Sequence, residues 1–269
     1  SEWLVSFDFT AATCVIPHAI TLYPFYTFLQ GDLHAHFISI PFILALAGLC
    51  LAMYRKFSQP LFCTAILVTC FLAGVNLWTL PACLFLVAWT GYCATKKKAF
   101  LLLAGLEGCA FLALLFLGRI CVFDPGERTG ILGFLLTFGG FAAVSGIYLV
   151  GSHTFSREDI LVAGAVIVAG VISFSLHFPL AMLSLFAIPF FVRAWSHQEY
   201  PAIFACIALF LIVFCEIFYI NDPYGPPYER LNTMMKFYLQ AWVFWAVASV
   251  YFLYRIQNRV LVAVAVAVI

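Results

Sequence analysis

The sequence predicts an all-α, polytopic integral membrane protein. Of its 269 residues, 65% are hydrophobic and only 9% are charged, whereas soluble domains carry about 25% charged residues. Its mean hydropathy is +1.07, and the apolar residues fall into runs bounded by charged clusters, the pattern of successive membrane helices. The main partner is therefore a lipid bilayer. A net charge of +1 excludes a broad basic surface for nucleic acid.

We expect about nine to ten helices that cross the membrane or part of it. Several runs are shorter than the roughly 20 residues of a full span, which predicts tilted, kinked or partly buried helices. Because the chain begins at Ser1 and stops soon after Arg259, we expect residues 1–269 to be a single transmembrane domain cut from a longer chain. The expected helices are 37–54, 60–78, 81–95, 99–118, 131–150, 160–176, 179–192, 201–220 and 238–254, with a truncated one from 260.

Residues 1–36 suit a segment on the outer face of the membrane rather than a span. They contain Asp8, His18 and two prolines, Pro17 and Pro24. Such residues interrupt a spanning helix, and this composition favours an interfacial or re-entrant segment.

The lysines and arginines predict the orientation. One set of helix ends carries nine of them: Arg55, Lys56, Lys96, Lys97, Lys98, Arg157, Arg193, Arg255 and Arg259. The opposite ends carry four: Arg119, Arg128, Arg230 and Lys236. Because cytoplasmic loops are enriched in Lys and Arg, we expect the first set to face the cytoplasm of a multi-pass protein in the cell membrane.

The polar residues that are not anchors then gather at the extracytoplasmic side. Polar groups close to lipid are costly and usually functional, so a site that opens outward is expected. This outer set comprises Asp32, His34, His36, Asn76, Trp78, Asp124, Glu127, His177, Glu216, Asp222, Glu229, Arg230, Asn232 and Lys236.

The first candidate site is the segment GDLHAH at residues 31–36. In an extended chain Asp32, His34 and His36 point to one side, and in a helix Asp32 and His36 share a face. Either arrangement offers a carboxylate and imidazoles to a divalent metal such as Mg or Mn, or a base with the group that orients it. A polar turn in which Asp32 caps the following helix explains the same residues.

The second candidate site is residues 221–240, an outer loop followed by a helix. Prolines and glycine make the loop rigid, and Pro227 can begin the helix. Arg230 and Lys236 near a helix start favour an anion such as phosphate, although a polar seam that only joins helices fits as well. The residues that fall on one polar stripe of this helix are Glu229, Asn232, Thr233, Lys236 and Gln240.

Three further positions carry weaker signals. Glu216 lies about one turn inside its apolar run and can join the outer site. Glu107 lies in the middle of a run, where an acid is either functional or protonated and hydrogen-bonded. Asn76 and Trp78 precede a tight outer turn, where a tryptophan also serves as an interface anchor.

Three blocks of sequence resemble the Chlor_Arch_YYY membrane-protein family, a domain of unknown function. They are residues 24–36 (PFYTFLQGDLHAH), Asn76-x-Trp78-x-x-Pro81, and residues 229–242 (ERLNTMMKFYLQAW). The family patterns are of the type PFFSF..GDLHPH, TNxWDxP and ERxNTxFKFYxQxW, in the same order. The chain departs from them at Leu22, where an acid is usual, at Ala35, which replaces a proline, and at Thr79, which replaces an aspartate.

This family is similar in sequence character to GT-C glycosyltransferases, which take a sugar from a polyprenyl-phosphate donor at an extracytoplasmic, often metal-assisted site. The resemblance implies a GT-C-like fold and roles for particular residues. Asp32 would be the general base or a metal ligand, with Glu216 and Asp222 as further candidates for the base. His34 and His36 would bind the metal or phosphate. The residues implied for substrate or phosphate binding are Glu229, Arg230, Asn232, Lys236, Gln240, Asn76 and Trp78.

Two other classes of function remain open. A transporter of an ion, sugar or lipid would need polar residues that continue to the cytoplasmic side. The stripe on residues 229–240 fades after Gln240 and only Glu107 lies deep, which favours a one-sided site. A non-catalytic membrane protein would use the same polar residues for stability alone.

Overall fold

The computed structural model describes residues 13–21, 23–31, 33–122, 128–151, 189–194 and 199–256, with residues 168, 259, 262, 263 and 266. The described chain is almost entirely helical, which confirms the predicted all-α class. Five of its helical segments are long and apolar enough to cross a membrane: Ala35–Arg55, Leu77–Thr95, Ala99–Phe116, Ile131–Leu149 and Leu231–Arg255. The expected helices 160–176 and 179–192, and the one from 260, lie largely outside the described residues.

The contacts divide the chain into two compact units. Unit 1 comprises Ser1–Tyr23, Phe123–Ile217 and Gly225–Ile269, and unit 2 comprises Pro24–Val122 and Phe218–Tyr224. Helix bundles of one membrane domain can divide in this way, so the single domain expected over residues 1–269 stays a prediction.

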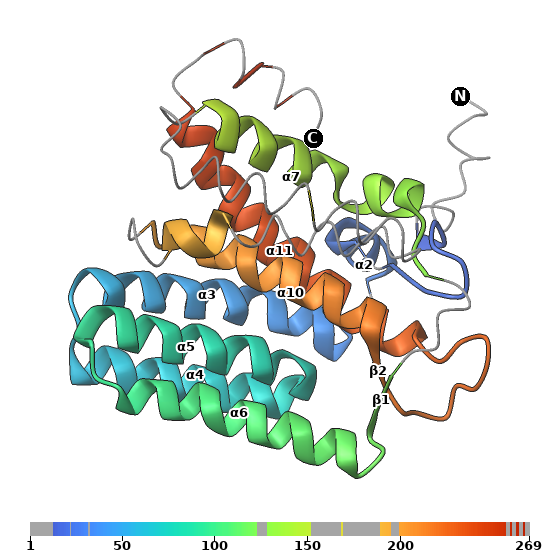
Figure 1. Cartoon of the computed structure of the whole chain (residues 1–269), viewed down its shortest axis with the longest axis horizontal. Helices are drawn as coiled ribbons and strands as arrows, with labels where there is room; N and C mark the ends of the chain where they lie inside the picture. The colour runs from blue at the N-terminus through green and yellow to red at the C-terminus, as the bar shows by residue number, and fades with distance from the viewer. Residues whose placement is uncertain are drawn as a thin grey trace. The chain divides into compact units, whose positions relative to one another are not determined.

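Unit 2 begins with the short helix α2 (Pro24–Gln30), followed by four longer helices that alternate in direction. These are α3 (Ala35–Arg55), α4 (Gln59–Val75), α5 (Leu80–Thr95) and α6 (Ala99–Phe116), and a 3-10 turn η2 (Leu77–Thr79) links α4 to α5. Figure 1 shows the four side by side, with α5 in contact with the other three. α6 buries none of its residues, as expected of an apolar helix that faces lipid.

Local sequence sets the helix ends of unit 2. Ser58 precedes α4, and its hydroxyl accepts a hydrogen bond from the Leu61 amide at 3.4 Å while Pro60 occupies the first turn. Lys96 ends α5 in the left-handed conformation, with φ of 57°. The expected runs 37–54, 81–95 and 99–118 are thus confirmed as helices to within a few residues, whereas the run 60–78 ends as an α-helix at Val75.

Two short strands interrupt the helical pattern of unit 2. β1 (Ile120–Val122) pairs antiparallel with β2 (Phe218–Ile220), with Cys121 opposite Tyr219. The expected helix 201–220 was wrong at its last three residues, because α10 (Ala202–Ile217) ends where β2 begins. β-branched and aromatic residues at 218–220 favour a strand once a pairing partner is present.

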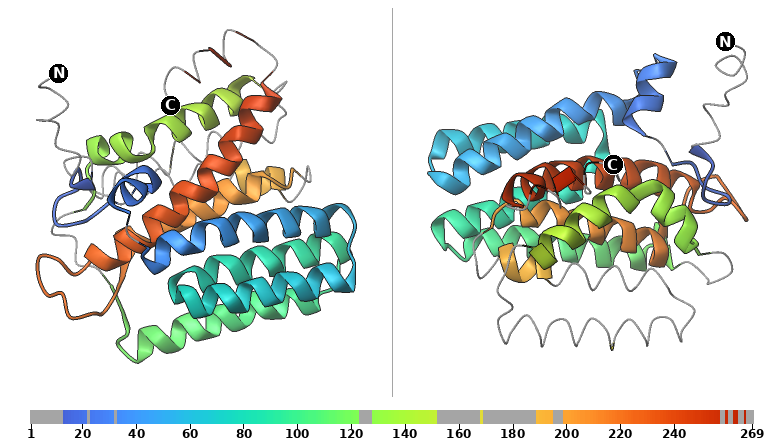
Figure 2. Two further views of the ribbon diagram at one scale, coloured as in Figure 1. Left: turned by 180° about the vertical axis from the view of Figure 1, so that it is seen from behind. Right: turned by 90° about the horizontal axis from the view of Figure 1, so that it is seen from above.

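Unit 1 contains α7 (Ile131–Gly151), α10 and α11 (Leu231–Arg255), and α11 packs against both of the others. Figure 2 shows these helices from two further directions. Aromatic rings fill the contact of α7 with α11: Trp245 lies 5.9 Å from Phe138 and 6.2 Å from Phe141 between ring centroids. The Trp245 indole also donates a hydrogen bond to Ser145 at 2.8 Å, so its polar atom is satisfied within the core.

α11 is longer than the expected span 238–254 because it begins at Leu231. It nevertheless begins two residues after Glu229, the first residue of the predicted polar stripe. Pro226 and Pro227 lie in a turn, and the helix begins at Leu231 with Arg230 as its N-cap. Pro227 therefore does not begin the helix, and Glu229 lies in the turn that precedes it. Asn232, Thr233, Lys236 and Gln240 are in the helix, as expected.

Gly91 should be irreplaceable in α5, because a methyl group there would overlap the Phe100 ring. Phe100 cannot easily move, since its ring lies 6.0 Å from Phe57 and 5.4 Å from Phe62 between centroids. Gly91→Ala should destabilise the protein by about 1–3 kcal/mol, the usual cost of overpacking. Gly105→Ala is the matched control, because nothing lies near its added methyl group. Denaturation in mild detergent measures both, and equal stability of the two variants would contradict the packing argument.

Candidate functional site

A buried carboxylate organises one end of unit 1. Glu216 is 0% exposed and lies in the last turn of α10. Its Oε2 accepts a hydrogen bond from the Thr129 amide at 3.1 Å. Its Oε1 accepts from the Thr129 hydroxyl and from the Tyr238 hydroxyl at 3.3 Å. Both carboxylate oxygens therefore have donors, as a buried acid requires.

Two arginines complete this group, which we call the Glu216 cluster (Arg128, Thr129, Glu216, Arg230 and Tyr238). The Arg230 guanidinium forms an ion pair with Glu216 Oε1 at 3.1 Å and donates to the Cys215 carbonyl at 3.3 Å. The Arg128 guanidinium donates to the Glu216 carbonyl at 3.1 Å. Arg230 is only 5% exposed, so this pair lies in a low-dielectric environment where its Coulomb attraction is strong.

Three chain segments bring the cluster together. The last turn of α10 supplies Glu216. The N-cap and second turn of α11 supply Arg230 and Tyr238, and the residues before α7 supply Arg128 and Thr129. The turn at 225–230 is held by backbone hydrogen bonds from Tyr228 to Gly225 and from Leu231 to Tyr228, at 2.9 and 3.0 Å. This turn fixes Arg230 immediately before the first helical residue.

The described residues of the Glu216 cluster hold more positive than negative charge, with two guanidinium groups and one carboxylate. Desolvation lowers the pKa of Arg128, Glu216 opposes this effect, and the nearby Arg230 adds to it. The two arginines thus repel each other across the carboxylate.

The polar stripe on α11 runs inward from the cluster. Thr233 and Gln240 are buried, and Asn232 and Lys236 are half-buried. The Gln240 side-chain amide donates to the Lys236 carbonyl at 3.2 Å. Tyr238, which is not among the residues of the predicted stripe, donates its hydroxyl hydrogen bond to Glu216.

In unit 2, the GDLHAH segment meets the Asn76 turn. His34 is the N-cap of α3, and its ring centroid lies 5.3 Å from that of His36, which is 4% exposed. The Ser39 hydroxyl donates to the His36 carbonyl at 2.7 Å, and the Asn76 amide donates to the Ser39 hydroxyl at 3.5 Å. Two of the three sequence blocks are therefore adjacent within this unit.

The predicted metal ligands are only partly described. Asp32 lies outside the described residues, so the set of Asp32, His34 and His36 is not tested. Within the described part of the chain, no three His, Cys, Asp or Glu side chains come together as a metal site. Two imidazoles at the separation of His34 and His36 can contribute to one site only with a third ligand from elsewhere.

The remaining predicted residues separate by unit. Asp222 belongs to unit 2, where its Oδ1 accepts a hydrogen bond from the Tyr224 amide at 2.8 Å. Its Oδ2 is buried and has no hydrogen-bond partner among the described residues. Trp78 lies half-buried in η2. Glu229, Arg230, Asn232, Lys236 and Gln240 belong to unit 1, as does Glu216.

A second polar group lies at the opposite end of the unit 1 helices, and sequence reasoning missed it. We call it the Glu199 cluster (Tyr148, Arg193, Glu199 and Arg255). The Tyr148 hydroxyl donates to Glu199 at 2.6 Å, and Arg193 lies 3.5 Å from the same carboxylate oxygen. Arg193 and Arg255 had been interpreted only as cytoplasmic anchors, although Arg193 is just 6% exposed.

These features define a polytopic α-helical membrane protein with buried ion pairs. The chain belongs to an uncharacterized membrane protein family (DUF2298), which it matches over residues 1–245. No curated protein and no solved structure matches it. The family assignment confirms a membrane protein with a bilayer as its partner, while the similarity to GT-C glycosyltransferases stays a prediction.

Proposed function

We propose that this protein is a membrane-embedded transferase resembling GT-C glycosyltransferases, which moves a sugar from a polyprenyl-phosphate donor at the extracytoplasmic side. The observation that carries the proposal is the placement of two guanidinium groups, those of Arg128 and Arg230, around the buried Glu216 beside the start of α11. A donor of this class presents one phosphate at the edge of the bilayer. Buried cations at such a place suit a lipid-linked phosphate better than a neutral substrate.

The chemistry needs stabilisation of the departing polyprenyl phosphate and a base for the acceptor hydroxyl. Negative charge develops on the phosphate as the glycosidic bond breaks, and fixed cations lower the energy of that transition state. In this proposal Lys236 and Arg128 face the phosphate. Arg230 acts as a positioning residue, because its guanidinium is already paired with Glu216.

The role of base belongs to Asp222 or Asp32 rather than to Glu216. The Glu216 carboxylate already accepts hydrogen bonds from Thr129, Arg230 and Tyr238, so its acceptor capacity is largely used. One oxygen of Asp222 has no hydrogen-bond partner in the described chain. A carboxylate oxygen with spare acceptor capacity suits proton abstraction.

A divalent metal ion, Mg or Mn, fits this proposal if Asp32 joins the two histidines. His34 and His36 would supply imidazole ligands and Asp32 a carboxylate. Such an ion would supply Lewis-acid chemistry to the oxygen atoms that it binds. Glu229, Asn232, Gln240, Asn76 and Trp78 are the proposed contacts with the sugar and with the charged groups.

The proposal predicts that the purified protein retains polyprenyl phosphate through Lys236. Native mass spectrometry of wild type in mild detergent, supplied with polyprenyl phosphate, should show a bound lipid. Lys236→Ala should reduce the affinity for this lipid at least tenfold, since hydrogen bonds to charged groups are worth about 1.5–3 kcal/mol, and Lys236→Arg should retain the lipid. Asp222→Asn should keep the lipid and lose sugar transfer from a polyprenyl-phosphate sugar. Equal amounts of bulk phospholipid alone in every variant would reject the transferase.

Transport is the second candidate, and one observation favours it. Buried polar side chains continue beyond Gln240 when α7 is included: Ser145, Ser249 and then the Glu199 cluster. The expectation that polarity fades after Gln240 considered α11 alone. Aromatic rings of Phe138, Trp245 and Phe252 nevertheless fill the space between the two clusters. The test is ion flux into proteoliposomes that contain the protein. A flux that is present with wild type and absent with Glu199→Gln would favour transport.

A further inference from the structure

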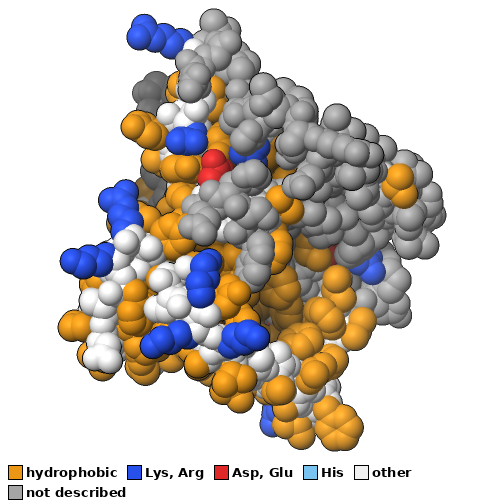
Figure 3. Space-filling model, turned by 60° about the vertical axis from the view of Figure 1, so that its left-hand side comes forward, with side chains coloured by type: hydrophobic (Ala, Val, Ile, Leu, Met, Phe, Trp, Pro, Cys, Tyr) orange, Lys and Arg blue, Asp and Glu red, His pale blue; other side chains and the backbone are white. Residues whose placement is uncertain are grey.

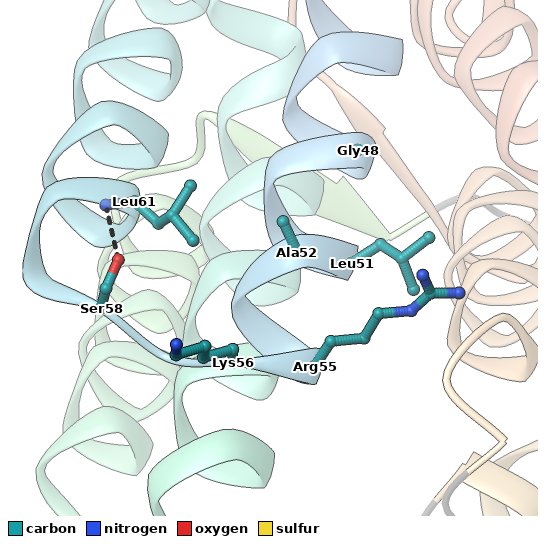
Figure 4. A pocket seen from close by; sticks show the side chains of 7 residues that line it. All are labelled: Gly48, Leu51, Ala52, Arg55, Lys56, Ser58 and Leu61. Atoms are coloured by element: carbon teal, nitrogen blue, oxygen red, sulfur yellow. Dashed lines mark hydrogen bonds between the residues drawn. The ribbon is translucent and has the colours of Figure 1, made fainter.

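A groove lies in unit 2 where α3 turns into α4, at the opposite end of α3 from His34 and His36. It has a volume of about 690 Å³, and its apolar wall is formed by Gly48, Leu51, Ala52 and Leu61. Figure 4 shows these residues on the last turns of α3 and the first turn of α4. A methyl group added at Gly48 would meet nothing within 4 Å, so this glycine leaves the wall open. We call this feature the α3–α4 groove.

The polar end of the α3–α4 groove carries two cations. Arg55 and Lys56 line it together with Ser58, and both cations are exposed. No ion pair in the described part of the chain involves either of them. The groove thus joins an apolar wall to two positive charges that acidic side chains of the described chain do not neutralise.

The surroundings of the groove are also basic. Because α3 and α5 run in the same direction and pack together, the turn after α5 lies at the same end of unit 2. That turn contains Lys96, Lys97 and Lys98. Figure 3 shows exposed Lys and Arg side chains beside hydrophobic surface. The positive-inside pattern predicts that this end faces the cytoplasm, where the bilayer surface is anionic.

These properties select a ligand that is both apolar and anionic. Inorganic phosphate would use the cations and leave the apolar wall exposed to water. A zwitterionic lipid would use the wall but bring its own positive charge beside Arg55 and Lys56. We propose that the α3–α4 groove binds one anionic phospholipid, with its phosphate on Arg55 and Lys56 and the start of an acyl chain along Gly48, Leu51 and Ala52.

The test compares two lipids that differ only in headgroup. The full chain is purified with equimolar phosphatidylglycerol and phosphatidylcholine of the same acyl chains, and retained lipids are counted by native mass spectrometry. Wild type should retain phosphatidylglycerol preferentially. Arg55→Ala with Lys56→Ala should lower this preference about thirtyfold, since each of the two cations near an anionic headgroup contributes about 1 kcal/mol.

Two matched variants separate a defined site from general surface charge. Lys97→Ala with Lys98→Ala removes the same charge at the same end of unit 2 and should leave the preference unchanged. Gly48→Leu fills the groove without altering charge and should lower retention of phosphatidylglycerol. Equal losses in the two double variants would overturn the proposal. Displacement of the bound lipid by millimolar glycerol phosphate would also overturn it, because a headgroup anion alone would then suffice.

Discussion

Replacing Glu216 with alanine is expected to destabilise the protein by about 3–5 kcal/mol, the usual cost of removing one partner of a buried ion pair. The loss arises because Arg230, at 5% exposure, would keep its charge without its carboxylate. The Thr129 amide and hydroxyl and the Tyr238 hydroxyl would lose their acceptor in the same step. Detergent-induced unfolding, followed by tryptophan fluorescence, measures this change.

A double variant distinguishes the charge from the packing. In Glu216→Leu with Arg230→Met, both charges are removed and the volume is largely kept, so much of the lost stability should return. Glu107→Ala is the matched acid control, because Glu107 is half-buried in α6, a helix that buries none of its residues. If Glu216→Ala were no worse than Glu107→Ala, the Glu216 cluster would not hold unit 1 together.

The helices were predictable because lipid imposes a simple composition on them. The run 99–118 reads as an apolar helix from end to end, and α6 occupies Ala99–Phe116. The strands β1 and β2 were not predictable, because their pairing joins segments about 100 residues apart. The short strand at 218–220 continues an apolar run without a break, so hydropathy alone extends the helix through it.

The sequence was sufficient to predict which charged residues belong to the candidate site, but not which side chains they contact. Glu216 and Arg230 stood out as charged groups beside apolar runs, and the structure pairs them. Thr129 gave no signal, because a threonine in a loop resembles any other polar loop residue. Tyr238 was not included in the predicted polar stripe, because a tyrosine within an apolar helix resembles its hydrophobic neighbours, yet its hydroxyl can reach a buried acid.

The opposite end of unit 1 should be as sensitive as the Glu216 cluster. Arg193→Ala is expected to cost about 3–5 kcal/mol, because Glu199 would lose its buried cation. The Arg193 guanidinium lies 3.5 Å from Glu199 and 5.0 Å from the centre of the Tyr148 ring. The same ring stacks on Phe252 with centroids 4.5 Å apart, so the variant would also loosen the contact of α7 with α11.

Arg255 provides a control within the same cluster. Its guanidinium lies 3.7 Å from Glu199, but its side chain is 53% exposed. An exposed pair of this kind contributes about 0–1 kcal/mol. The free energy of unfolding of Arg255→Ala should therefore be close to that of wild type, although this variant removes the same charge. Arg193→Lys should fall between the two, because an ammonium keeps the charge and loses the planar donor geometry. Equal losses for Arg193→Ala and Arg255→Ala would mean that net charge, rather than the buried contacts of Arg193, stabilises this end of the helices.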